Sequence, residues 1–384
     1  MKLGDENEQN VKILISSLTL GNTVSLEEID VQNISTLGGS LDMRSNFRLR
    51  KFLAGGSSLS EAHFADGGAL EEVDYPASTS YVELKNLDKL TNEKCNTEAC
   101  APNVMSYFVS GCDNLQPIKM LIGIMDAQVG QVPHALRYVR CVGFNETFTD
   151  GRAFDKLSQL VDGTYQGIDA EGQYGNDPYP VLDGIINLTT GAYRDTYDAL
   201  MTHYPKLKLN IAKWWIRFED PEVKRICIEN WDKDGDGELS MEEAAAVSSI
   251  GTMFSNKEFT SLREIGFFGA SELAKGAFKN VVVSGVLIYP SSCKAVSDGC
   301  FFNATIDTID IPASVTYLAG TCFHSSKTKN IIFRSKTPPK LYGYQEFGGK
   351  IRMGKIYIPD NSIELYRTKW GSWLPFAPLS EYQG

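Results

Sequence analysis

Apolar residues recur in step along the first part of the chain, at intervals of 21 to 23 residues in its regular stretches. The first copy, Leu26, Ile29, Val31 and Ile34, follows the pattern L-x-x-L-x-L-x-x-I. The same register returns at four places: Leu49 and Phe52; Leu70, Val73 and Tyr75; Leu115, Ile118 and Met120; and Leu136, Val139 and Cys141. This pattern predicts short strands that stack in a parallel sheet, because no single repeat buries its apolar face alone. The spacing is irregular over residues 84–109, and a chance scatter of leucines is the alternative interpretation.

A second block repeats a small residue followed by phenylalanine. The pairs Ala277-Phe278, Cys300-Phe301 and Cys322-Phe323 are separated by 23 and 22 residues, and Pro290 and Pro312 by 22. A ring at one fixed phase predicts a core in which phenylalanines fill the space between coils, while the small residue lets the backbones approach. The prolines predict a turn after each strand.

Between the two blocks, residues 232–243 read D-K-D-G-D-G-E-L-S-M-E-E, the spacing of an EF-hand calcium loop. The expected ligands are the carboxylates of Asp232, Asp234 and Asp236, the backbone carbonyl of Glu238, Ser240 through a water, and Glu243 as a bidentate clamp. Carboxylates this close together repel one another unless a hard divalent cation lies among them. We therefore expect Ca²⁺ as the cofactor, with a solvated acidic turn as the alternative.

Helical patterns flank this loop. Asp220-Pro221 is a helix-start signal, and Val223, Ile226, Cys227 and Trp231 follow at spacings of three and four. The alanine-rich residues 244–247 favour a second helix after the loop. The sequence holds no second loop of this type, so we expect a structural calcium site rather than a paired sensor.

These patterns predict an α/β solenoid with two leucine-rich repeat blocks of parallel sheets, joined by a single EF-hand helix-loop-helix. The expected domains are an N-terminal repeat block over residues 1–165, a closing cap over 166–212, a calcium-binding junction over 213–258, a second repeat block over 259–348 and an aromatic C-terminal cap over 349–384.

Both caps carry candidate binding residues. In the first, residues 191–204 predict a helix and 207–211 a strand, and Asp169, Glu171 and Asp177 offer oxygens to a second cation, although a solvated loop is the favoured interpretation. Five aromatic residues are expected to seal the last coil: Tyr357, Tyr366, Trp370, Trp373 and Phe376. Carbohydrate stacking on one of these rings is the alternative.

Composition narrows the function classes. A net charge of −11 without any lysine or arginine cluster argues against nucleic acid as a partner. No apolar run reaches the roughly 20 residues of a membrane span, and the polar start of the chain shows no signal peptide. The eight cysteines form no CxxC metal pattern; Cys95 and Cys100 are spaced for a possible disulfide, and the others suit a buried core.

Several segments resemble known families. G-A-F-K-N, D-I-P-A-S-V, S-K-T-P-P and the ending I-Y-I-P-D-N-S-I-E-L-Y-R-T-K-W resemble the BspA-like leucine-rich repeats of surface and secreted proteins in gut Bacteroidales. F-E-D-P-E-V-K-R-I-C-I-E-N-W, followed by the acidic loop, is similar to the junction that often precedes such repeats. In the N-terminal half, L-G-G-S-L-D-M, S-G-C-D-N-L-Q and P-V-L-D-G resemble leucine-rich domains of tail-associated or fibre proteins in gut phages and prophages.

The resemblance implies adhesion or receptor recognition, and the residues supply no catalytic pattern such as G-x-S-x-G, H-E-x-x-H or a P-loop. We therefore expect a non-enzymatic protein that binds a protein or glycan on a bacterial or host surface through a concave repeat surface. The alternative is a structural connector or fibre subunit that contacts sister subunits of a phage tail or cell-surface assembly. Either role implies a location outside the cell, on the cell surface or on a virion.

Overall fold

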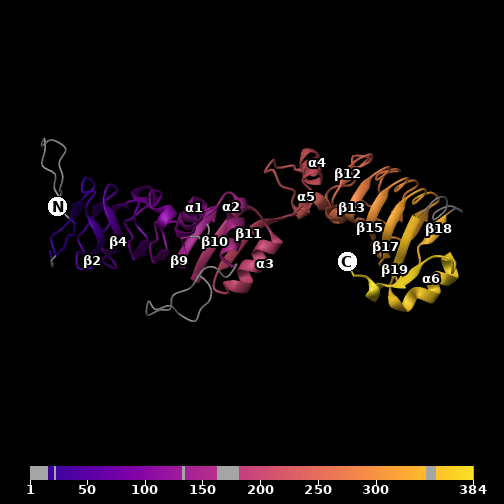
Figure 1. Ribbon diagram of the computed structural model, residues 1–384. Helices are drawn as coiled ribbons and strands as arrows, with labels where there is room; N and C mark the ends of the chain where they lie inside the picture. Colours follow the sequence, from indigo (N-terminus) through magenta and orange to yellow (C-terminus); the bar gives the residue numbers. More distant parts are fainter. Residues whose placement is uncertain (1–15, 21–22, 132–134, 162–180, 343–351, 384) are drawn as a thin grey trace. The chain divides into compact units, whose positions relative to one another are not determined.

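The computed structural model describes residues 16–20, 23–131, 135–161, 181–342 and 352–383 (Figure 1). The chain divides into two compact units, Met1–Ala212 and Lys213–Gly384, here called unit 1 and unit 2. The predicted limits at residues 165, 258 and 348 remain predictions. The segment with Asp169, Glu171 and Asp177, the predicted second cation site, lies outside the described residues.

Unit 1 is built on two sheets. Sheet A has the order β1-β3-β5-β7, and sheet B the order β11-β10-β9-β8-β6-β4-β2. The strands of sheet A are β1 Glu28–Asp30, β3 Lys51–Leu53, β5 Glu72–Asp74 and β7 Cys95–Asn96. Those of sheet B are β2 Gly38–Met43, β4 Ser58–Phe64, β6 Tyr81–Lys85, β8 Ser106–Ser110, β9 Tyr138–Phe148, β10 Val181–Tyr193 and β11 Lys208–Trp215. Each early coil therefore gives one strand to each sheet.

The in-phase apolar residues account for sheet A. Ile29 pairs with Phe52, Phe52 with Val73, and Val73 with Cys95, all in parallel register. These four side chains are at most 5% exposed and belong to one core. The prediction of stacked parallel strands is confirmed here, because alternate side chains of each short strand point between the two sheets. The irregular stretch over residues 84–109 still supplies β7, which pairs with β5 in sheet A, and most of β8, which pairs with β6 in sheet B.

The same register was wrong for the two later copies. Ile118 and Met120 lie in helix α1 Pro117–Ala127, and Val139 and Cys141 lie in β9, a strand of sheet B rather than sheet A. Proline at the first helical turn and buried side chains at helical spacing explain the helix. From this point helices α1, α2 Gly151–Asp155 and α3 Arg194–His203 stand in the chain positions that sheet A strands hold earlier. Short 3₁₀ turns complete unit 1: Asn92–Lys94, Ala101–Asn103 and Lys156–Val161.

A buried carboxylate caps the first of these helices. Glu146 of β9 is 1% exposed, and its oxygens accept hydrogen bonds from the backbone N–H groups of Ile118, at 2.6 Å, and Lys119, at 3.1 Å. The contact joins the free N–H groups at the start of α1 to the sheet that it covers. Burial nevertheless raises the pKa of Glu146 to about 7, against the effect of the two hydrogen bonds.

Unit 2 begins with helices α4 Pro221–Trp231 and α5 Met241–Ala245 and continues as two further sheets. Sheet C, in the order β12-β13-β15-β17-β19-β20, and sheet D, in the order β14-β16-β18, are both parallel. The strands of sheet C are β12 Glu258–Phe259, β13 Val282–Ile288, β15 Thr305–Ile311, β17 Lys327–Phe333, β19 Arg352–Ile358 and β20 Phe376–Pro378. Sheet D contains β14 Ala295–Val296, β16 Tyr317–Ala319 and β18 Lys340–Tyr342. Helix α6 Ile363–Trp370 and the 3₁₀ turns Arg263–Phe267, Asp360–Ser362 and Leu379–Glu381 complete the unit.

The predicted phenylalanine register is confirmed in unit 2. Phe278 stacks on Phe301 at a centroid distance of 5.5 Å, and Phe301 on Phe323 at 5.2 Å with an interplanar angle of 6°. All three side chains are fully buried. A second ladder runs along the turns, where Asn280 donates to the side-chain oxygen of Asn256 and Asn303 to that of Asn280, at 2.8 and 2.9 Å. In the ring stack and in the asparagine ladder, each coil therefore contributes one residue, which contacts the equivalent residue of the next coil.

The predicted aromatic cap forms only in part. Tyr366, Trp370 and Phe376 pack together with ring centroids 4.9 to 6.3 Å apart. Tyr357 instead lies on the other side of sheet C against Tyr382, because it alternates with core residues along β19. Trp373 was wrongly placed in the cluster: it is 69% exposed and follows Gly371, which ends α6 with a φ of 104°.

The eight cysteines are all buried, as expected for core residues. Cys95 and Cys100, which the spacing left open as a disulfide, are free thiols here, and Cys100 donates to the backbone carbonyl of Thr97 at 3.3 Å.

The ring stack predicts a large cost for Phe301→Ala. Its full burial between two rings means that truncation leaves a cavity, so we expect the free energy of unfolding to fall by about 3 to 5 kcal/mol. Phe302→Ala is the matched control, because the neighbouring ring stacks on His324 outside the core and its loss should cost less than about 1 kcal/mol. Urea unfolding of the three proteins measures both changes. Equal costs at the two positions would contradict the ring stack.

Glu146 predicts a pH-dependent stability. The folded pKa of about 7 exceeds the ordinary value of 4.5, so the folded chain holds an extra proton between these values. The contribution of protonated Glu146 to the free energy of unfolding is therefore fully present below pH 4.5. It is lost as the pH rises through 7, by up to about 3 kcal/mol. Glu146→Gln keeps the shape without the charge and should remove this slope. Urea titrations across the window, with the exposed Glu98→Gln as control, measure it. An unchanged slope in Glu146→Gln would show that this carboxylate does not cause it.

Candidate functional site

The acidic loop lies between α4 and α5, as predicted, and a buried aspartate fixes its entry. The carboxylate of Asp220 accepts hydrogen bonds from the backbone N–H groups of Glu222 and Val223, at 2.8 and 3.2 Å. Its second oxygen accepts from the backbone N–H of Thr260 at 2.6 Å and from the Thr260 hydroxyl at 2.9 Å. Although burial opposes it, these bonds lower the pKa of Asp220. The cap of α4 is thereby tied to the first strand region of sheet C.

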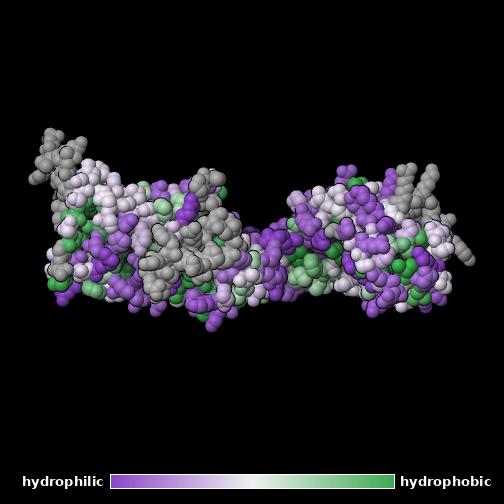
Figure 2. All heavy atoms as spheres, turned by 60° about the horizontal axis from the view of Figure 1, so that its bottom comes forward, coloured by the Kyte–Doolittle hydropathy of each residue, from purple (hydrophilic) through white to green (hydrophobic). Residues whose placement is uncertain are grey.

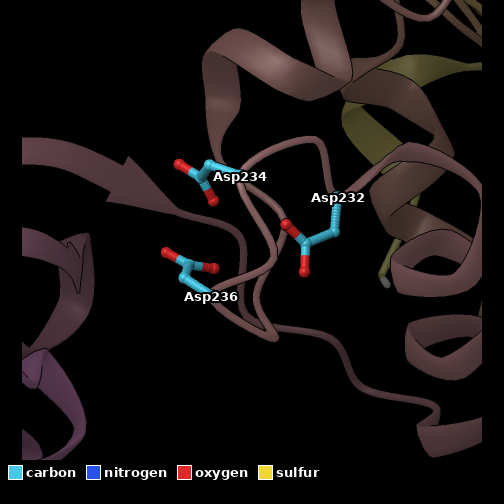
Figure 3. Close-up of side chains that lie close together, drawn as sticks. All are labelled: Asp232, Asp234 and Asp236. Atoms are coloured by element: carbon cyan, nitrogen blue, oxygen red, sulfur yellow. The ribbon is translucent and has the colours of Figure 1, made fainter.

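Three of the predicted ligands come together. Oxygens of Asp232, Asp234 and Asp236 all lie within 4.8 Å of one another, and Figure 3 shows an oxygen of each carboxylate turned toward the space between them. The Asp232 oxygens accept from the backbone N–H groups of Gly235, at 2.8 Å, and Gly237, at 2.9 Å. Both glycines have a positive φ, 72° and 77°, which a residue with a Cβ adopts at a cost.

The other three predicted ligand residues make different contacts with their side chains. The Glu238 carboxylate lies 2.7 Å from the ammonium of Lys224; the predicted ligand atom of this residue is its backbone carbonyl. Ser240 and Glu243 form a capping box at the start of α5, in which the Glu243 carboxylate accepts a hydrogen bond from the Ser240 backbone N–H at 2.9 Å. The Glu243 carboxylate also accepts a hydrogen bond from the Lys233 backbone N–H at 2.8 Å. Burial acts against these hydrogen bonds, but they lower the pKa of Glu243. The structure thus places Glu243 at the helix cap rather than among the three aspartates.

Two residues that the sequence did not indicate also reach the loop. The ammonium of Lys213 forms ion pairs with Asp234 and, at 2.7 Å, with Asp236. The indole N–H of Trp215 donates to Asp236 at 3.0 Å. Burial raises the pKa of Asp236, but Lys213 and the hydrogen bonds outweigh it and lower the pKa. Both residues lie about twenty positions before the loop, so no local spacing marks them.

The donor set suits a hard cation. Carboxylate oxygens that converge from one short loop are the ligands that calcium prefers. In this structure the ammonium of Lys213 supplies the positive charge at two of these carboxylates, those of Asp234 and Asp236. Asp232, Asp234 and Asp236 are therefore the residues able to hold a divalent ion, with Glu243 available if its capping contacts exchange.

A second candidate surface lies on the solvent-facing side of sheet B, and sequence reasoning missed it. Parallel register places Glu61 opposite Tyr81, and Glu83 opposite Phe108. The ring of Tyr81 lies 5.2 Å from that of His63 and 5.6 Å from that of Phe108, measured between centroids. We call these five residues the aromatic strip: Glu61, His63, Tyr81, Glu83 and Phe108. It runs across strands β4, β6 and β8, and Phe108, at its β8 end, is only 8% exposed.

Polar and charged side chains contact one another within the aromatic strip and beside it. His63 lies 3.1 Å from Glu61, Lys85 is 2.7 Å from Glu83, and Arg140 is in register with Phe108. Burial, followed by the nearby Glu83 carboxylate, raises the pKa of Tyr81, so this hydroxyl stays protonated at neutral pH. The signal in the sequence was the alternation in Y-V-E-L-K, where Val82 and Leu84 point inward and their neighbours outward. Which outward residues share a row depends on register, which the sequence leaves open.

The comparison with protein families supports the second repeat block. A family model for the BspA type leucine rich repeat region matches residues 251–369 in six copies. The BspA-like repeats predicted for this part of the chain are thereby confirmed, and such repeats point to a surface role in protein binding or adhesion. The comparison with curated proteins finds no match for the chain. Among the described residues, no helix has the length and apolarity that crossing a bilayer requires.

Proposed function

We propose that this chain is a non-enzymatic adhesion or receptor-binding protein that acts outside the cell, at a surface. It binds a protein or glycan of a bacterial or host surface through the solvent-facing side of sheet B. The observation that carries this proposal is the aromatic strip, which brings three rings and two carboxylates from three adjacent strands into two neighbouring rows.

Physical arguments favour the strip as a binding surface. Its side chains stand on a hydrogen-bonded parallel ladder, so little conformational entropy is lost when a ligand is bound. Aromatic rings with polar ends contribute much of the energy at protein and glycan interfaces. The face drawn in Figure 2 carries hydrophobic residues in small groups among hydrophilic ones.

We further propose a structural calcium ion held by Asp232, Asp234 and Asp236. The Glu238 backbone carbonyl, Ser240 through a water, and Glu243 would complete the ligands as the loop spacing predicts. When bound, the ion neutralises the mutual repulsion of the carboxylates. A bound ion would thereby stabilise the helix-loop-helix segment of unit 2 against unfolding.

Variants of the strip test the adhesion proposal. The isolated chain should attach saturably to intact gut bacteria, and Tyr81→Ala and Glu83→Ala should each weaken attachment by about tenfold or more. Glu72→Ala is the matched control: Glu72 also stands on a parallel strand and pairs with a lysine, Lys51 at 3.3 Å, but on sheet A. Fluorescently labelled protein measures attachment. Equal losses in Glu72→Ala and Glu83→Ala would exclude the strip, and self-association without attachment would favour a connector or fibre subunit instead.

Calcium removal tests the metal proposal. Calcium that binds only the folded chain should add roughly 2.7 kcal/mol to the free energy of unfolding at a hundredfold excess over its dissociation constant. Glu243→Gln should remove most of that gain, because glutamine still completes the capping box with Ser240 but lacks the charge. Melting in EDTA and in millimolar calcium measures the effect, with the exposed Glu242→Gln as control. Identical curves for the unaltered chain would exclude the calcium site.

A further inference from the structure

Lys213 occupies an unusual place for a lysine. Its ammonium contacts the carboxylates of Asp234 and Asp236, two of the three residues that converge in the acidic loop. The side chain is only 19% exposed, and that of Asp236 only 18%. The pair is therefore largely shielded from water, where an ion pair is stronger than on an open surface.

The backbone fixes Lys213 in this position. Trp215 forms an antiparallel bridge with Ser240, and the backbone N–H of Ile216 donates to the carbonyl of Leu239 at 2.8 Å. Side chains two positions apart on a strand point the same way, so Lys213 and Trp215 both face the loop. Each of them contacts Asp236, Lys213 through its ammonium and Trp215 through its indole N–H. The end of β11 thus lies along the loop as a neighbouring strand.

This arrangement conflicts with a bound divalent ion. An ion at Asp232, Asp234 and Asp236 would take the same carboxylate oxygens that the ammonium now contacts, and two cations at one pair of carboxylates repel each other strongly. Without the ammonium, three converging carboxylates would have no opposite charge among them. The lysine therefore stabilises the loop in the absence of calcium and opposes calcium when it arrives.

We propose that Lys213 is an internal counter-cation that calcium must displace, so that calcium binding releases the end of β11 from the loop. The inference rests on the proposed calcium site and adds a regulatory role to it. The loop stays folded without calcium, its calcium affinity is set below that of its aspartates alone, and calcium changes the surroundings of Trp215.

Calcium titration of the full chain tests this proposal. By calorimetry with calcium chloride, Lys213→Gln should bind calcium about tenfold more tightly than the unaltered chain, a typical size for coupling between competing groups. Lys208→Gln is the matched control, because it makes the same charge change at an exposed position of the same strand. Lys213→Arg keeps the positive charge, and its affinity should stay near that of the unaltered chain.

Tryptophan emission gives a second readout. Calcium should change the emission of the unaltered chain, and Trp215→Phe should remove that change, because Trp215 is the tryptophan bonded to Asp236. In EDTA, Lys213→Gln should have a lower melting temperature than Lys213→Arg. This comparison separates loss of the internal cation from a general defect in folding.

The outcomes distinguish the two proposals. Calcium uptake that is equal in the unaltered chain and Lys213→Gln would overturn the role of Lys213 and leave the calcium site standing. No uptake by either protein would overturn both. Uptake that is detected or tightened only when Lys213 is replaced would support the internal counter-cation.

Discussion

The structure depends on the parallel pairing of strands from successive coils. Each short strand buries its inward side chains only because the next coil covers them, and the hydrogen-bonded register forces equivalent positions to stack. The phenylalanine stack and the asparagine ladder of unit 2 are consequences of that rule, since both follow the coil period. The same rule places outward side chains in rows. The aromatic strip spans two such rows, Glu61 with Tyr81 and Glu83 with Phe108, so its arrangement follows from the same register.

The inward half of this arrangement was predictable from sequence. Ile29, Phe52 and Val73 occur at one phase, and phase alone decides which side chains meet in the core. The failure at Ile118 has a physical cause, because an apolar run suits a buried strand and a buried helix equally well. Proline at the first turn and the helical spacing of the buried side chains favour the helix, and Glu146 caps it from a strand 28 residues away. Neither local propensity nor period reports such a contact.

The acidic loop, too, was predictable from the sequence only in part. Asp232, Asp234 and Asp236 converge because their spacing within one short loop suffices to bring them together, and sequence therefore identified them. Lys213 enters from the preceding strand, and its position depends on the bridge between Trp215 and Ser240. The loop spacing is compatible with two different roles for Glu243, calcium ligand or helix cap. Its capping contacts in the structure are those of the second role.

Charge also decides how the proposed binding surface works. The chain carries a net charge of −11, but Glu83, one of the two carboxylates of the aromatic strip, lies 2.7 Å from the neighbouring Lys85 ammonium. Opposite charges a few ångströms apart cancel at distances beyond the Debye length, about 8 Å at physiological salt. The strip therefore exerts little long-range attraction on a partner. Its selectivity must come from ring contacts and hydrogen bonds made after encounter, which act on the dissociation rate rather than on steering.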